Sequence, residues 1–422
     1  MKRILFISTS VPPHFESQTI RNAFFIKALS DNGYQIEIIT SPASKEDDSL
    51  RDIIANCKYN LTLIPPPWYP KFIQLVTNKL PNIYGKIIGY LANLLLVPDL
   101  FNGWSKKIMH SNLVHEKAKW SDIIISSSGS YEAHLAASKL SSKYQKCFVA
   151  ELGDPWAKNP IWPESFLIKR IANSHLEKKS LSNADLITFT TKQTTNSYKK
   201  TYTNTVIETI PMGFSRAEFP LPSTSPKNIE LNKVTYVGVA YKGSRDITPL
   251  IIAINDFEFS NLTLNVYGYT SQFFDRYVKE NLIDSVHFHG PVSYERSVDI
   301  LRKPSLLIIL GNDGKLQIPG KVYMYLATTN PILYLGREEK VDDPTWAFLS
   351  EFEGVFYANA SDRDDIQKTI SEINSNWQIA CQNSYIRAAG KNLAKYEWTE
   401  VSNRFASLVE KTFQAKRLSN EN

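Results

Sequence analysis

The sequence predicts an α/β protein of two domains, each with a parallel sheet covered by helices on both faces. Apolar, strand-like runs alternate with helical patterns along the chain, and this order is typical of parallel sheets. A stretch at 214–232 is rich in proline, serine and asparagine and has no periodicity, which is typical of a linker. The alternation then begins again. A chain of 422 residues is long enough for two domains, each with its own core.

The first domain is expected at 1–213. It opens with an apolar run at 4–9 that suits a buried strand, followed by helical spacing over 18–33, where Gly33 stands at a common helix end. Further strands are expected at 36–40, 122–127, 147–152, 186–189 and 206–210.

The second domain is expected at 233–395 and a C-terminal helix at 396–422, which we expect to return to the first domain. Strands are predicted at 234–239, 262–267, 286–289, 306–310, 332–335 and 355–357. Two α/β halves joined by a linker form a cleft, and ligands of such sheets bind beyond the carboxyl ends of the strands. An enzyme with a site between its domains is therefore expected.

Charge and cysteine usage narrow the class of protein. The net charge is +6, from 48 basic and 42 acidic residues, which suits a protein that handles anionic phosphates or touches an anionic membrane leaflet. No basic stripe is interleaved with aromatic residues, so nucleic acid is not an expected partner. Three scattered cysteines lack metal-ligand spacing and are typical of a reducing compartment. No run of about 18 apolar residues or signal-peptide pattern is present, and a cytoplasmic location is expected.

The segment 68–104 does not fit a plain α/β pattern. It is apolar and aromatic, with Lys71, Lys79 and Lys86 interspersed. This mixture favours a membrane surface or a lipid-linked acceptor, with aromatics at the headgroups and lysines toward anionic lipid. A pair of helices packed on the first domain is the alternative. The first interpretation places the chain peripherally at the inner face of a membrane.

Several ordered motifs resemble glycosyltransferase family four and its GT-B relatives, including the Asp-Pro-Trp branch that makes bacterial surface polysaccharides. In chain order they are ILFISTSVPPHFESQTIRNAFFIKALSDNGYQIEIIT, PDLFNGW, DIIISSSGSYEAHLAA, VAELGDPW, LSNADLITFTT, ETIPMGF, VTYVGVAYKGSRD and IPGKVYMYLATTNPIL. The resemblance implies two Rossmann-like domains facing a cleft. It also implies transfer of a hexose from a nucleoside diphosphate sugar to a lipid-linked glycan, with retention of configuration and without a metal or other cofactor.

The chain departs from the family pattern at two places. The first loop reads His14-Phe15-Glu16-Ser17 in place of a Gly-Gly pair, and the two donor-site glutamates of the family correspond to Leu316 and Met324. These departures keep two alternatives open. One is a non-catalytic GT-B scaffold subunit of a glycan assembly complex, and the other is a nucleotide-sugar epimerase.

Donor-binding residues are predicted at two helix starts in the second domain. Lys242 and Arg245 follow a predicted strand, and either cation suits the charge that develops on a departing nucleoside diphosphate. Asp246 is a candidate for orienting Arg245. Gly320 and Lys321 follow Pro319, a residue that suits a first helical turn, so their amides and the lysine could face phosphate.

Asp154 and His134 are the predicted catalytic residues of the first domain. Asp154 ends a strand, where a carboxylate could act as general base or bind acceptor hydroxyls. Glu151 lies three residues earlier and is expected on the opposite face. His134 could serve as base or electrophile, and a packed histidine is the alternative. His287 and His289 alternate on one strand without a third ligand, so no metal site is expected.

Overall fold

A computed structural model gives the structure of the chain. It describes residues 2–14, 16–43, 46–69, 72, 96–159, 167–224, 230–243, 245–257, 261–312, 314–337 and 339–421. Contacts divide the chain into unit 1, Met1–Pro211 with Val401–Asn422, and unit 2, Met212–Glu400. Among the described residues, no helix is both long and apolar enough to cross a bilayer.

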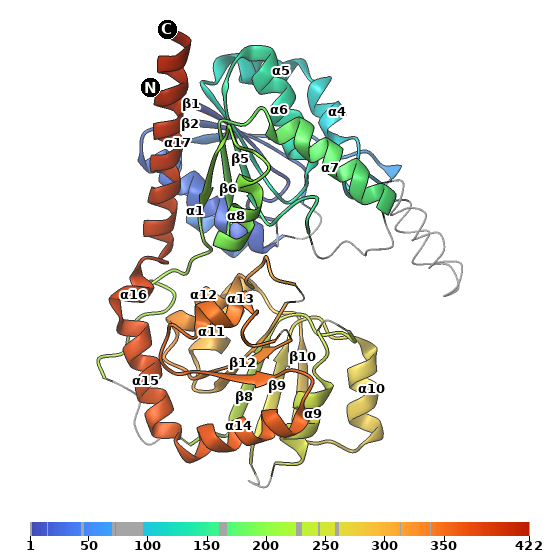
Figure 1. Cartoon of the computed structure of the whole chain (residues 1–422), viewed down its shortest axis with the longest axis vertical. Helices are drawn as coiled ribbons and strands as arrows, with labels where there is room; N and C mark the ends of the chain where they lie inside the picture. Colours follow the sequence, from blue (N-terminus) through green and yellow to red (C-terminus); the bar gives the residue numbers. More distant parts are fainter. Residues whose placement is uncertain are drawn as a thin grey trace. The chain divides into compact units, whose positions relative to one another are not determined.

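Unit 1 is built on a parallel sheet with helices packed around it (Figure 1). The strand order of this sheet is β3-β2-β1-β4-β5-β6-β7. The strands are β1 (Arg3–Ile7), β2 (Gln35–Thr40), β3 (Tyr59–Leu63), β4 (Ile123–Ser127), β5 (Cys147–Gly153), β6 (Leu186–Phe189) and β7 (Val206–Thr209). The helices are α1 (Ser17–Asp31), η1 (Asp48–Leu50), η2 (Asp52–Ile54), α4 (Trp104–Met109), α5 (Asn112–Trp120), α6 (Glu132–Tyr144), α7 (Leu167–Leu181), α8 (Lys192–Lys199) and α17 (Trp398–Glu421).

Unit 2 repeats this plan with the strand order β10-β9-β8-β11-β12-β13. The strands are β8 (Lys233–Val237), β9 (Thr263–Tyr267), β10 (Val286–Gly290), β11 (Leu306–Leu310), β12 (Ile332–Gly336) and β13 (Val355–Asn359). The helices are α9 (Thr248–Asn255), α10 (Gln272–Glu280), α11 (Tyr294–Arg302), α12 (Lys321–Ala327), α13 (Pro344–Leu349), α14 (Arg363–Ser375), α15 (Trp377–Ala389) and α16 (Lys391–Ala394).

The central strands are buried along their whole length, as expected for parallel strands with helices on both faces. Every residue of β4 and β11 is buried. Strand β1 pairs with β2 on one side and β4 on the other, and β8 pairs in the same way with β9 and β11. The strand order reverses at these two pairs, and ligands of doubly wound sheets bind at the carboxyl ends beside such a reversal.

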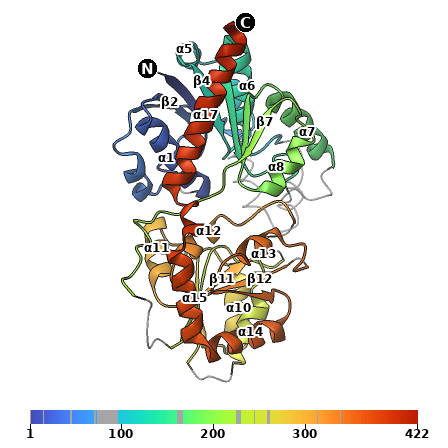
Figure 2. The ribbon, with the colours of Figure 1, turned by 60° about the vertical axis from the view of Figure 1, so that its left-hand side comes forward.

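The two-domain α/β fold class is confirmed, and so is the return of the C-terminal helix. Helix α17 lies beside α1 of unit 1 (Figure 2), where Phe405 stacks on Phe25 with ring centroids 4.0 Å apart. Lys416 of α17 also pairs with Asp185 at 2.8 Å.

The structure differs from the sequence prediction at one strand and at the linker. Strand β3 was not predicted, because it lies at the edge of the sheet with Leu61 and Leu63 exposed, and thus lacks a buried apolar run. Phe214 and Phe219 fall within the expected linker 214–232 but are buried in the core of unit 2. Residues 225–229 of that stretch lie outside the described residues.

We expect Phe405→Ala to lower the free energy of unfolding of unit 1 by about 3–5 kcal/mol, because it removes a fully buried ring from the contact with Phe25. Urea unfolding followed by circular dichroism would measure this. Leu418→Ala, at an exposed position of the same helix, is the matched control. Equal stability of the two variants would contradict the docking of α17 on unit 1.

Candidate functional site

Lys321 opens helix α12 beside the carboxyl end of β8. Its Nζ donates to the carbonyl oxygen of Val237 at 3.1 Å and lies 4.2 Å from the ring centroid of Tyr236. Gly238 leaves room for this arrangement, since a Cβ there would lie 2.8 Å from Nζ. Gly320, the residue before the helix, has helical backbone angles and no side chain to cap it.

Arg245 lies at the same strand ends. Its Nη1 is 3.5 Å from the carbonyl oxygen of Leu310, the last residue of β11, and its Nη2 donates to the side-chain oxygen of Asn312. Burial raises the pKa of Tyr236 to about 12, against the lowering effect of Arg245. Arg245 and Lys321 therefore meet around Tyr236, at the point where the strand order of unit 2 reverses.

The two cations influence each other. Burial, followed by the charge of Arg245, lowers the pKa of Lys321 well below its usual value. Within the described part of the chain, neither side chain forms an ion pair with a carboxylate. Lys321 donates to a backbone carbonyl, and Arg245 donates to a carbonyl, to the Asn312 amide oxygen and to the Tyr236 hydroxyl. Two cations without counter-ions are typical of a site that receives an anion.

Arg387 of α15 is a buried cation of unit 2 whose N–H donors are all taken up by hydrogen bonds within the unit. Burial lowers its pKa to about 9. Its guanidinium donates to five backbone carbonyls, those of Leu326, Thr328, Asn330, Glu353 and Gly354. This uses every N–H of the side chain. Lys321, in contrast, has three donors, and one described carbonyl accepts from it.

Lys242 is held away from the pair. Its Nζ donates to Asp246 at 2.9 Å and to the hydroxyl of Thr248 at 3.2 Å, and it lies 4.4 Å from the ring centroid of Phe273. The structure thus joins Asp246 to Lys242 and not to Arg245. Lys242 stays a predicted phosphate contact, but its charge is already balanced.

The positions that correspond to the donor-site glutamates of the family are apolar and partly buried. Met324 packs against the core of unit 2, and Leu316 lies in the loop before α12. Beside it, Gln317 is 8% exposed, and its Nε2 has no hydrogen-bond partner among the described residues. Gln317 was missed from the sequence, because an amide without periodic context carries no signal of burial.

Asp154 is exposed and follows β5 in unit 1. The residues after it are fixed by two helices: Trp156 is fully buried, its amide donates to the Tyr198 hydroxyl at 3.0 Å, and its indole donates to Asn173 at 2.8 Å. Glu151 is fully buried within β5, and that it faces away from Asp154 stays a prediction. The rigid loop presents the Asp154 carboxylate at the carboxyl edge of the sheet.

His134 is fully buried in α6, with each ring nitrogen bonded to a serine hydroxyl. Nδ1 lies 2.7 Å from the Ser126 hydroxyl and Nε2 lies 2.9 Å from that of Ser128. Burial lowers its pKa to about 3, so the ring is neutral at pH 7. Because neither nitrogen is free and none of the ring is exposed, the packed alternative describes His134 in this structure.

Three of the family-like motifs meet around Tyr131. Asp99 of PDLFNGW accepts from the Ser130 hydroxyl at 2.9 Å and from the Tyr131 amide at 2.7 Å, both in DIIISSSGSYEAHLAA, and burial raises the pKa of Asp99 to about 6. The Tyr131 ring stacks on Trp156 of VAELGDPW, with centroids 4.8 Å apart and planes 2° apart. These motifs therefore build one wall of unit 1 next to Asp154.

A buried ion pair was missed from the sequence. Arg21 and Glu151 are both fully buried and 2.8 Å apart. Arg21 also donates to the carbonyl oxygens of Ile210 and Pro211, at 2.8 and 2.6 Å, while Gln18 donates to Glu151 at 2.7 Å. A charged residue within an apolar helical pattern is ordinarily expected in solvent, so the local pattern does not predict the burial of Arg21.

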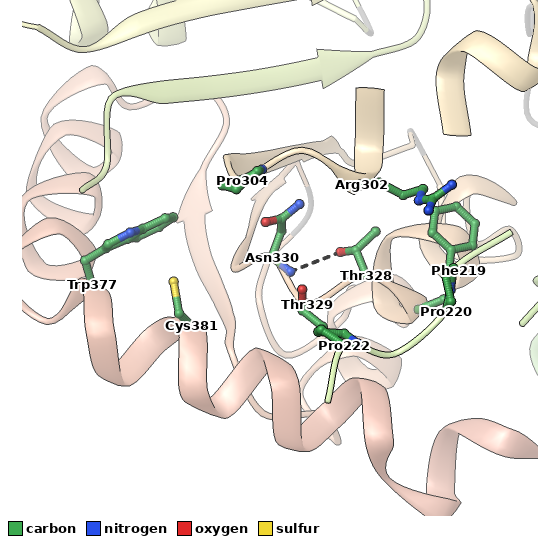
Figure 3. Close-up of a pocket in the computed structure, with 11 residues that line it drawn as sticks. Phe219, Pro220, Pro222, Arg302, Pro304, Thr328, Thr329, Asn330, Trp377 and Cys381 are labelled. Carbon is green, nitrogen blue, oxygen red and sulfur yellow. Dashed lines mark hydrogen bonds between the residues drawn. The ribbon is translucent and has the colours of Figure 1, made fainter. Parts of the chain in front are cut away.

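A pocket of about 280 Å³ lies at the amino ends of the unit 2 strands, opposite the ends that carry Arg245 and Lys321 (Figure 3). Pro304 and Asn330, which precede β11 and β12, line it, together with Trp377 and Cys381 of α15. It is therefore distinct from the Arg245–Lys321 pair. Elsewhere, no group of three or more His, Cys, Asp or Glu side chains in the described residues could hold a metal ion.

The chain matches no protein-family model, and no curated protein matches its sequence. Solved structures nevertheless resemble it over nearly its whole length. HepE of Anabaena in complex with UDP-glucose has a TM-score of 0.67 at 10% identity, covering 97% of this chain and 100% of that one. WaaG, a glycosyltransferase involved in lipopolysaccharide biosynthesis, has a TM-score of 0.62 at 10% identity, covering 96% and 99%.

A putative UDP-N-acetylglucosamine 2-epimerase from Listeria monocytogenes is also similar, with a TM-score of 0.59 at 12% identity and 98% of each chain covered. At such identities the likeness concerns the fold. Two Rossmann-like domains with these strand orders are the GT-B fold, and the chain has that fold.

We expect the free energy of unfolding to fall as the pH is lowered from about 6.5 toward 3. In this range His134 binds a proton in the unfolded chain but stays neutral in the folded chain. Between pH 6.5 and 5 the loss amounts to about 1.6 kcal/mol. His134→Asn should weaken the pH dependence of the free energy of unfolding, and urea unfolding at several pH values measures this dependence. The variant should also keep the catalytic rate of the wild type at pH 7.5. A folded variant that has lost catalysis would return His134 to the candidate catalytic residues.

Proposed function

We propose that this chain is a glycosyltransferase that moves a sugar from a nucleoside diphosphate sugar to a glycan acceptor. The observation that carries the proposal is the pair of Arg245 and Lys321 beside Tyr236. Breaking the bond between sugar and diphosphate leaves negative charge on the diphosphate, and cations placed in advance stabilise that charge. The pair lies where ligands of doubly wound sheets bind.

The partly satisfied ammonium group of Lys321 supports this role. Diphosphate oxygens would supply the acceptors that its Nζ lacks, and their charge would favour the protonated lysine that burial disfavours. Arg245 presents a planar fork of N–H donors that fits two phosphate oxygens. Because HepE was solved with UDP-glucose, UDP sugars are the first donors to test.

Asp154 is the proposed acceptor-side residue. An exposed carboxylate on a rigid loop can accept a hydrogen bond from the attacking hydroxyl and orient it. Retention of configuration, a lipid-linked acceptor and independence from metal belong to the same proposal and rest on the motifs. Of the segment 68–104, Lys71, Lys79 and Lys86 lie outside the described residues, so its expected membrane contact stays a prediction.

An epimerase is the second candidate, favoured by the similarity to the Listeria protein. A scaffold without activity is the third, favoured by the apolar Leu316 and Met324. One assay of the purified protein with UDP sugars distinguishes the transferase, the epimerase and the scaffold. Transfer to an acceptor indicates the transferase, a changed sugar with UDP still attached indicates the epimerase, and neither nucleotide binding nor turnover indicates the scaffold.

Arg245→Ala and Lys321→Met should each weaken UDP binding about 10- to 100-fold, because each removes a charge-assisted contact to the diphosphate. Isothermal titration calorimetry measures the affinity. Lys315→Ala is the matched control, since that lysine is exposed and paired with Asp342. Unchanged affinity in both site variants would overturn the assignment of the donor site.

Asp154→Asn should lower kcat about 100-fold while UDP affinity stays as in the wild type, because the carboxylate that orients the acceptor hydroxyl is lost and the residue lies in the other unit from Arg245 and Lys321. Steady-state kinetics and calorimetry on one preparation separate the two effects. Asp52→Asn, at an exposed position of unit 1, serves as control. Full turnover in the Asp154 variant would remove it from the mechanism.

A further inference from the structure

The pocket at the amino ends of the unit 2 strands has walls from several segments of the chain. In Figure 3, Trp377 and Cys381 extend from α15 on one side, Arg302 and Phe219 lie on the other, and residues 328–330 lie between them. The volume of about 280 Å³ is close to the lower end of small-molecule sites, about 300 Å³. A compound with a single ring suits this volume.

Two side chains fix these walls. Asn330 donates to the backbone oxygens of Leu301 and Lys303, both at 2.8 Å, and so joins the loop before β12 to the end of α11. Arg387 of α15 donates to the backbone oxygens of Thr328 and Asn330, at 2.9 and 2.8 Å. Because these bonds form within the protein itself, a ligand that enters the pocket loses little free energy to ordering of the walls.

Backbone acceptors around the pocket already have donors. The oxygen of Phe219 accepts from the Arg216 guanidinium at 3.3 Å, and that of Pro222 accepts from the Tyr385 hydroxyl at 3.3 Å. The oxygens of residues 328 and 330 accept from Arg387, as described above. A ligand rich in N–H donors is therefore a poor fit, because acceptors at the pocket are already engaged.

Two donors of the lining, in contrast, lack acceptors. The indole Nε1 of Trp377 is buried without a hydrogen-bond partner among the described residues, and the whole residue is 6% exposed. Arg302 is exposed, and within the described part of the chain its guanidinium takes part in no hydrogen bond or ion pair. A buried N–H without an acceptor is unfavourable, and an oxygen of a ligand would remove that cost.

The charge of the lining has one sign. Arg302 is the charged residue among those that line the pocket, and no acidic residue accompanies it. Cys381 adds no charge near neutral pH, because burial raises the pKa of its thiol to about 11. The apolar part of the lining consists of Phe219, Pro220, Pro222, Pro304 and Ala327. A cation beside apolar walls favours an anionic group carried on a ring.

We propose that this pocket binds a small ring compound with an anionic group at one end and an oxygen acceptor at the other. The anionic group accepts from the Arg302 guanidinium, the second oxygen accepts from the Trp377 indole, and the ring packs against the prolines. Carboxylates and phosphate esters share this chemistry. Ala327, the last residue of α12, lines the pocket, whereas Lys321 of the proposed donor site is the first. The proposal concerns binding alone and holds whether or not the chain transfers sugar.

The test is titration of the full-length protein with 4-hydroxybenzoate and with glucose 1-phosphate, followed by saturation-transfer NMR of the ligand protons. We expect at least one of them to bind with a Kd of about 1 mM or less. Arg302→Gln should raise that Kd about tenfold, and Trp377→Phe, which keeps a ring but removes the N–H, about fivefold. Arg296→Gln, at an exposed position of the same helix α11, is the matched control.

The donor pair is the other place where an anion could bind, so the test includes Arg245→Ala. Binding of the probe should be unchanged in this variant, and UDP should not displace the probe. Three results would overturn the proposal: neither probe binds below about 10 mM, Arg302→Gln and Trp377→Phe both bind like the control, or Arg245→Ala abolishes binding. Equal melting temperatures of the variants and the wild type exclude misfolding as the cause of lost binding.

Discussion

Parallel strand pairing with one reversal of strand order constrains everything else in each unit. Strand β1 is shared by β2 and β4, and β8 by β9 and β11, so the loops that follow these strands leave the sheet at the same edge. Arg245, Lys321 and Asp154 all follow or adjoin such strand ends. Because parallel strands end together, residues far apart in the chain, such as Arg245 and Lys321, meet beside Tyr236.

The buried cations of the chain differ in how many of their N–H donors have partners, and this difference separates structural cations from the proposed ligand-binding one. Removing a cation from water costs several kcal/mol unless hydrogen bonds or a counter-ion replace the solvent. Arg21 receives a carboxylate and two carbonyls, and Arg387 receives five carbonyls; both fix chain segments within their own unit. Lys321 receives one carbonyl and an aromatic ring, which leaves donors for a ligand.

Large apolar side chains of unit 1 also fall into two groups, buried and exposed. Trp104 and Trp156 are fully buried and donate their indole N–H groups to unit 1, as folded cores require. Trp68 and the isoleucines of α7 gain no such burial within the described residues. The contrast separates residues that hold the unit together from residues that leave part of its surface apolar.

The fold class and nearly every strand can be predicted from the sequence, because buried parallel strands are continuous apolar runs and their alternation with helices leaves few topologies. The sequence also placed Asp154, Arg245 and Lys321 at strand ends or helix starts, which follows from local order along the chain. Which groups meet became visible in the folded chain: Asp246 pairs with Lys242, His134 is bonded to two serines, and Arg21 is buried against Glu151. Burial and pairing depend on contacts between distant segments, and a local pattern does not carry that information.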